Sequence, residues 1–117
     1  MAIDRRPIDQ MILDVGPEAF CRLAGLFQDE TRGAVAEMGG RLAALDWREL
    51  GRQAHSMKHA TASFGLIDLA AAAASLERAA DGGDAEAASQ SLAQLTDRID
   101  AEVVAFAALI AELGAPE

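Results

Sequence analysis

The chain of 117 residues contains no tyrosine, one tryptophan, three prolines and one cysteine. Aromatic residues make up only 4% of it, which argues against a β-sandwich or barrel, because strands are enriched in aromatic side chains. A single cysteine cannot form an internal disulfide bond and is typical of a reducing compartment. No apolar run approaches the roughly 20 residues that a membrane-spanning helix needs. Residues 1–7 lack the apolar stretch of a signal peptide, so we expect a cytoplasmic protein.

Positive charge is also scarce. Ten lysine and arginine residues stand against 19 aspartate and glutamate residues, which gives a net charge of −9. This charge would repel nucleic acid and anionic membranes, so neither is expected as a partner. Hydrophobic residues make up 51% of the chain, as in folded soluble proteins, and alanine, the strongest helix former, is abundant. The composition therefore predicts an all-α protein.

Glycine, proline and aspartate divide the chain into five segments whose apolar residues recur at helical spacing. Four amphipathic segments of roughly 15 to 30 residues can bury their apolar faces together as an antiparallel four-helix bundle. A short additional N-terminal helix, residues 8–15, would cap one end. We expect residues 1–117 to form this single domain, and we expect it to be a monomer.

The second helix should begin at Pro17, since proline is favoured at the first helical position. Gly39 and Gly40 are expected to loosen or end this helix. The residues expected on its inward face are Phe20, Leu23, Phe27, Val35 and Met38.

The third helix has the clearest boundaries. Asp46 and Glu49 have the spacing of a capping box, and Gly65 is a suitable C-terminal cap. The inward face of the helix is predicted to consist of Leu50, Ala54, Met57, Thr61 and Phe64. The opposite face then carries a narrow strip of basic residues, namely Arg48, Arg52, His55, Lys58 and His59. This strip contains the only lysine and the only two histidines of the chain.

An exposed histidine has chemistry of its own. A neutral imidazole has a nitrogen lone pair available near pH 7, because its ordinary pKa is about 6.5. It can act as a nucleophile without a separate base. Lys58, one turn from His55, would offset the charge of a phosphoryl group attached to it. The residues around His55 are therefore suited to a histidine that carries a phosphoryl group.

The stretch Ala54–Gly65, read as A-H-S-M-K-H-A-T-A-S-F-G, resembles the signature of histidine-containing phosphotransfer (HPt) domains. That signature is approximately A-H-x-L-K-G-x, five further residues and a glycine, followed by a leucine and a late L-E pair. Here the leucine is Leu69 and the pair is Leu76-Glu77. The upstream residues that resemble the family are Ile8-Asp9, Gly16 to Phe20, Leu23 and Phe27, so the resemblance covers nearly the whole chain.

The resemblance implies a four-helix bundle in which His55 accepts a phosphoryl group from an aspartate of one receiver domain and passes it to another. Lys58 matches the lysine that helps hold this group, and Gly65 matches the glycine that lets the next helix turn away. Such domains have no kinase activity and bind no cofactor, since the receiver brings the Mg²⁺. The implied partners are response-regulator receiver domains and a hybrid histidine kinase. The residues expected to meet them are Arg48, Arg52, His59, Ala62 and Gly65.

The sequence departs from the family pattern at His59, where the family usually has glycine after the lysine. An imidazole at this position would either narrow the set of receivers accepted or donate a hydrogen bond to the phosphoryl group. Two other interpretations stay open. A related adaptor could bind a receiver or kinase without being phosphorylated. A metal-dependent enzyme could use the His55 and His59 pair, although two ligands do not make a metal site and no metal is expected.

Overall fold

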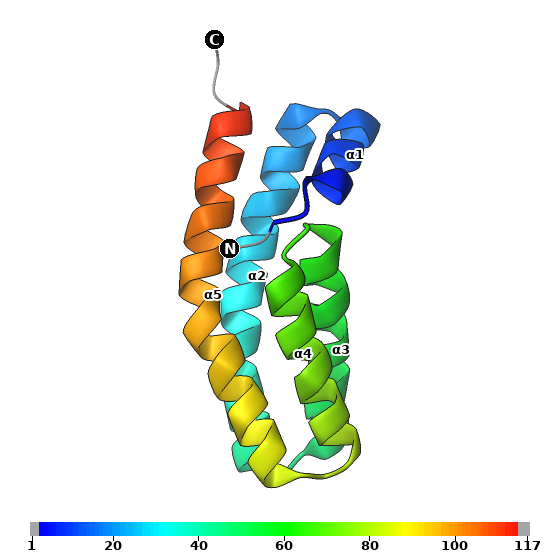
Figure 1. The fold of residues 1–117 in the computed structure, drawn as a ribbon, viewed down its shortest axis with the longest axis vertical. Helices are drawn as coiled ribbons and strands as arrows, with labels where there is room; N and C mark the ends of the chain where they lie inside the picture. The colour runs from blue at the N-terminus through cyan, green and yellow to red at the C-terminus, as the bar shows by residue number, and fades with distance from the viewer. Residues whose placement is uncertain (1–2, 115–117) are drawn as a thin grey trace.

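Five α-helices make up the fold in a computed structural model that describes residues 3–114 (Figure 1). They are α1 (Arg5–Val15), α2 (Pro17–Ala43), α3 (Trp47–Ser63), α4 (Ile67–Asp81) and α5 (Ala85–Gly114). Over residues 3–114 the only pairing of the β type is an isolated bridge between Ile3 and Leu66. The prediction of an all-α bundle is confirmed. None of the helices in this range is long and apolar enough to cross a membrane.

The four long helices run alternately up and down, and α1 lies against α2 at one end of the bundle (Figure 1). Helix α3 packs against α2 and α4, and α5 packs against the same two helices. Helices α3 and α5 are therefore diagonal to each other, which leaves the outer face of α3 to the solvent. The molecule is a rod of 50 × 23 × 21 Å.

All four phenylalanines of the chain meet in one aromatic cluster inside the bundle. The rings of Phe27 and Phe64 stack with their centres 4.4 Å apart, and Phe106 meets both of them edge-on. Phe20 completes the cluster through its contact with Phe64, with the two ring centres 6.1 Å apart. The cluster joins α2, the end of α3 and α5, and so fixes the end of α3 relative to the rest of the bundle.

Two expectations for α2 are wrong. Leu23 is 44% exposed, and Ala24 takes the interior position, because the buried residues of α2 follow the spacing of Phe20, Ala24 and Phe27. The helix also continues through Gly39 and Gly40 to Ala43 instead of loosening there. Each glycine costs about 1 kcal/mol in a helix relative to alanine. Burial of the helix face against α3 and α5 outweighs that cost.

A buried carboxyl group lies on α5. Glu102 is 3% exposed, and within residues 3–114 its Oε1 atom has no hydrogen-bond partner. Burial raises the pKa of Glu102, the negative charge of Asp68 on α4 raises it further, and Arg98 on α5 acts in the opposite direction. The folded protein therefore binds a proton at Glu102 more tightly than the unfolded chain does.

We expect Glu102→Gln to stabilise the protein, and more so at pH 8 than at pH 5. Because the folded-state pKa is raised, the wild type loses stability as the pH rises above the ordinary glutamate value and through the folded value. Glutamine carries no charge to bury, so the gain at pH 8 should be on the order of 1 kcal/mol. Urea unfolding of both proteins at the two pH values measures it. An equal difference in unfolding free energy between the two proteins at pH 5 and at pH 8 would contradict the expectation.

Candidate functional site

Helix α3 begins at a cap that is only half of the expected capping box. The Asp46 side chain accepts a hydrogen bond from the backbone N–H of Glu49, at 3.3 Å. The reciprocal bond is absent, because the backbone N–H of Asp46 donates to the carbonyl of Arg41. The Glu49 carboxylate binds Arg52 instead. One side-chain cap is sufficient to start the helix at Trp47.

The two faces of α3 are as predicted. The residues predicted to face inward are all buried, namely Leu50, Ala54, Met57, Thr61 and Phe64. The hydroxyl of Thr61 is satisfied inside the helix by the carbonyl of Met57, at 2.7 Å. The opposite face is in solvent, and the side chain of His55 is 52% exposed there. His55 is therefore available to a macromolecular partner.

Gly65 makes the turn that brings α4 back along α3. Its φ of +76° is a conformation that favours glycine, and a Cβ atom there would lie 2.0 Å from the carbonyl oxygen of Asp4. The backbone N–H of Asp4 donates to the Gly65 carbonyl at 2.8 Å. Gly65 is buried under this segment. The expectation that it forms part of a partner-binding surface is wrong, because its role is to permit the turn.

The turn places one carboxylate of α4 against two functional side chains of α3. The Oε2 atom of Glu77 lies 2.7 Å from Nδ1 of His55, and its Oε1 atom accepts a hydrogen bond from Nζ of Lys58 at 2.6 Å. The structure thus brings His55 and Lys58 together through a residue that was not predicted as part of the site. The late Leu76-Glu77 pair was the only trace of it in the sequence.

The charge of Glu77 decides which nitrogen of His55 carries the proton. The hydrogen bond from Lys58 is the largest effect on the pKa of Glu77 and lowers it. Burial acts in the opposite direction, and the hydrogen bond with His55 lowers the pKa again, so that the net shift is downward. The carboxylate is therefore ionised at neutral pH and can only accept a hydrogen bond. It follows that Nδ1 of neutral His55 carries the proton, and that Nε2 presents its lone pair away from Glu77.

The second histidine lies directly beside the first. The ring centres of His55 and His59 are 4.5 Å apart, with an angle of 68° between the ring planes. His59 is exposed, as predicted. Within residues 3–114, no three histidine, cysteine, aspartate or glutamate side chains are grouped so that they could hold a metal ion.

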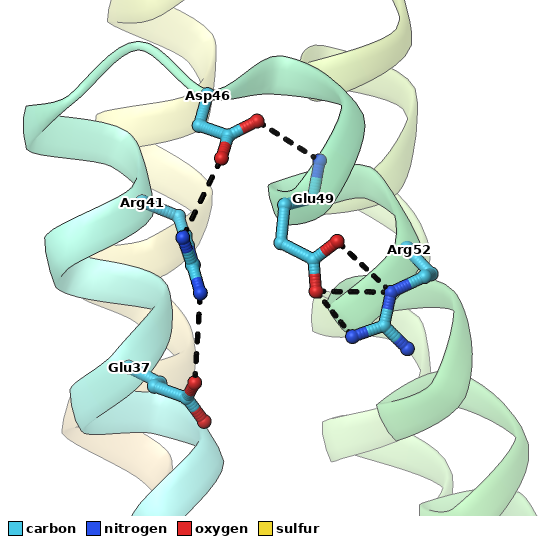
Figure 2. A network of polar contacts seen from close by, with 5 residues as sticks. All are labelled: Glu37, Arg41, Asp46, Glu49 and Arg52. Atoms are coloured by element: carbon cyan, nitrogen blue, oxygen red, sulfur yellow. Dashed lines mark hydrogen bonds and ion pairs between the residues drawn. The ribbon is translucent and has the colours of Figure 1, made fainter.

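Two arginines near the start of α3 are paired with carboxylates. Arg41 on α2 lies between Glu37 and Asp46, with nitrogen–oxygen distances of 3.9 and 3.5 Å (Figure 2). Arg52 contacts both carboxylate oxygens of Glu49 (Figure 2). In the predicted basic strip, Arg48, Arg52, His55 and His59 are exposed and Lys58 is half-buried. The charges of Arg52 and Lys58 are paired with carboxylates of the protein.

A groove of about 250 Å³ lies between α2 and α3, beside the histidines. The surface of the groove is largely apolar, and its lining also includes exposed acidic and basic side chains. The residues that line it are Phe27, Glu30, Thr31, Ala34 and Glu37 on α2, and Arg52, Gln53, Ser56, Met57 and Ala60 on α3. The exposed face around His55 thus continues into a depression on the α2 side.

The pattern of the Hpt domain family matches residues 22–105, which include His55, Lys58, Gly65 and Glu77. The chain belongs to this family. The fold of this Hpt domain is similar to the crystal structure of histidine-containing phosphotransfer protein B from Pseudomonas aeruginosa PAO1. The TM-score is 0.87, the sequence identity is 20%, and the match covers 94% of this chain and 95% of the other. No curated protein matches the chain.

Membership of the Hpt family supports a histidine phosphotransfer role in phosphorelays. Members of this family are carriers of phosphoryl groups rather than kinases, and they interact with receiver domains and kinases. The likeness to the Pseudomonas structure, at 20% identity, establishes the four-helix fold. The acceptor residue of this particular Hpt domain has to be argued from its own side chains.

Proposed function

We propose that this Hpt domain accepts a phosphoryl group on Nε2 of His55 from a receiver-domain aspartate and passes it to the aspartate of another receiver. The observation that carries the proposal is the contact between Nδ1 of His55 and the ionised Glu77 carboxylate. This contact leaves an unprotonated nitrogen on an exposed, oriented imidazole. That is the requirement for a nucleophile that attacks phosphorus.

In the proposed step, the Nε2 lone pair attacks the phosphorus of an aspartyl phosphate. The N–P bond forms as the P–O bond to the aspartate breaks, and the aspartate leaves as a free carboxylate. The phosphorylated ring keeps its proton on Nδ1 and so carries a positive charge. Glu77 stabilises that charge through its 2.7 Å contact, and no proton has to leave the site. The group is passed on by the same step in reverse, in which the aspartate of a second receiver attacks the phosphorus and His55 is the leaving group.

Lys58 has a second acceptor available once the phosphoryl group is in place. Its side chain is 31% exposed, and its ammonium group now donates to Glu77. An ammonium group has three donors, so it can bind Glu77 and a phosphoryl oxygen together. Mg²⁺ would be held by the acidic pocket of the receiver and not by this chain.

The receiver would dock over the exposed face of α3 and the groove between α2 and α3. The apolar walls of the groove, including Phe27 and Met57, suit an apolar helix face. Ala62 is exposed and small, and it leaves room beside His55 for the loops of the receiver. Arg48 and Arg52 lie toward the start of the same helix, where they would contact the edge of the partner.

The test is a transfer assay against a panel of phosphorylated receiver domains from the same organism. We expect label on this protein that is labile in acid and stable in alkali, as phosphohistidine is, and no label on the His55→Ala variant. The fastest donor would identify the partner.

An adaptor role is the alternative outcome of the same assay. Tight binding of one receiver that survives His55→Ala, with no label transferred from any receiver, would contradict the proposal. The chain would then be a docking protein that is not itself phosphorylated.

Glu77→Gln is expected to slow phosphoryl transfer to His55 by about tenfold or more, the equivalent of one charge-assisted hydrogen bond. Glutamine has a similar shape but lacks the charge that stabilises a protonated phosphoimidazole. Stopped-flow or rapid-quench transfer from one receiver measures the rate. Glu86→Gln, an exposed glutamate in the first turn of α5, is the matched control. A wild-type rate in Glu77→Gln would remove Glu77 from the mechanism.

A further inference from the structure

His59 lies within reach of any group attached to His55. The centres of the two rings are 4.5 Å apart, and His59 is exposed. In the part of the chain that the structure describes, the nitrogens of the His59 ring have no hydrogen-bond partner; its backbone carbonyl accepts from Ser63. Its ring is therefore a donor without an acceptor, placed beside the proposed phosphoryl site.

The two cationic side chains next to His55 on α3 already have carboxylate partners, although Lys58 keeps further N–H groups for a phosphoryl oxygen. Lys58 donates to Glu77 at 2.6 Å, and Arg52 is bound to Glu49. The helical repeat of about 3.6 residues places Lys58 on the α4 side of His55 and His59 on the side of the groove. A phosphoryl group on Nε2, which points away from Glu77, would therefore have Lys58 on one side and His59 on the other.

We propose that His59 is a second ligand of the phosphoryl group, with one ring N–H donating a hydrogen bond to a phosphoryl oxygen on His55. This inference rests on the proposed function and adds to it a residue that retains the phosphoryl group. The bond exists only in the phosphorylated protein. It therefore stabilises that form relative to the unphosphorylated one, and it shifts the transfer equilibrium toward this protein.

A purely steric role of His59 has a different signature. The equilibrium constant of transfer between two free proteins depends on their phosphorylated and unphosphorylated forms, and not on the complex that they form. A side chain that only obstructs or guides a docking receiver changes the forward and reverse rates together and leaves the equilibrium constant as it is. A ligand of the phosphoryl group changes the equilibrium constant itself.

The experiment measures this equilibrium constant with one receiver that labels the wild type, for His59→Phe, His59→Gly and His59→Gln. Phenylalanine keeps an aromatic ring of similar size but has no N–H, and glutamine keeps a donor without the ring. We expect the constant to move about tenfold toward the receiver in His59→Phe and His59→Gly, and less in His59→Gln. Circular dichroism verifies that each variant is folded, as expected for substitutions at an exposed position.

A wild-type equilibrium constant in His59→Phe and His59→Gly would overturn the inference, whether or not the rates change. Faster transfer in His59→Gly with an unchanged constant would assign His59 a steric role instead. These results are distinguishable from failure of the proposed function. If the wild type takes no label on His55 from any receiver, the proposed function fails and this inference fails with it. If His55 takes the label but the substitutions of His59 leave the equilibrium constant of transfer unchanged, this inference alone is overturned.

Discussion

Replacing His55 with glutamine is expected to reduce phosphoryl acceptance by more than about a thousandfold, as the loss of a nucleophile does in covalent catalysis. Glutamine has no nitrogen lone pair that attacks phosphorus. The fold should be almost unaffected, since half of the side chain is in solvent and substitutions at such positions change stability by about 0.5 kcal/mol or less. Transfer of label from a phosphorylated receiver, together with a thermal melt, measures both effects.

The matched control for His55→Gln is Gln94→Ala. Gln94 is exposed on α5, which is diagonal to α3 in the bundle. We expect the control to accept label at the wild-type rate. Two results would contradict the placement of His55. Label that persists in His55→Gln would move the acceptor elsewhere, and extensive unfolding of that variant would mean that the side chain supports the core.

Gly65→Ala is expected to lower the free energy of unfolding by at least about 2 kcal/mol. A non-glycine residue in the left-handed region costs about 1–2 kcal/mol. The added Cβ would also lie 2.0 Å from the Asp4 carbonyl oxygen, so the segment before α1 would have to move and weaken its bond to Gly65. The midpoint of thermal unfolding should fall by about 8 °C or more.

Gly33→Ala is the control for this substitution and is expected to have the opposite sign. Gly33 lies within α2 in helical conformation, and a Cβ atom there would meet nothing within 4 Å. Alanine should therefore stabilise the helix by about 1 kcal/mol. If Gly65→Ala were as stable as the wild type, the segment before α1 would not be fixed against the turn in the way that the structure describes.

The sequence predicted α3 well because its signals are local. The Asp46 cap, the spacing of the buried residues and the glycine at 65 all act within one helix and its ends. They determine that His55 and Lys58 lie on the outer face of the helix. Reasoning of this kind reaches the nucleophile of the proposed site, since periodicity shows which side of a helix is free.

Glu77 could not be placed in the same way. It is 22 residues from His55 in the sequence, and its contact depends on how α4 packs against α3. The close approach of the two helices is visible at Gly51 of α3, where a Cβ atom would lie 3.3 Å from the carboxylate of Asp81. Neither distance is encoded in the periodicity of a single helix.

Helix α2 shows the limit of local propensity. Gly39 and Gly40 weaken a helix by about 1 kcal/mol each, yet the helix continues through them. Burial of Met38 just before them, and of the rest of that face, provides more stabilisation than the glycines remove. Leu23 was assigned to the inward face because it lies at helical spacing from Phe20, whereas the buried face of α2 contains Ala24 instead.

The most direct test of the central proposal identifies the atom that carries the phosphoryl group. Nitrogen-15 NMR of the imidazole rings, recorded before and after phosphorylation by a receiver, distinguishes the two nitrogens of His55 and separates them from those of His59. We expect the phosphoryl group on Nε2 of His55, with the proton retained on Nδ1 against Glu77. A phosphoryl group on Nδ1 of His55, or on His59, would contradict the arrangement from which the function is inferred.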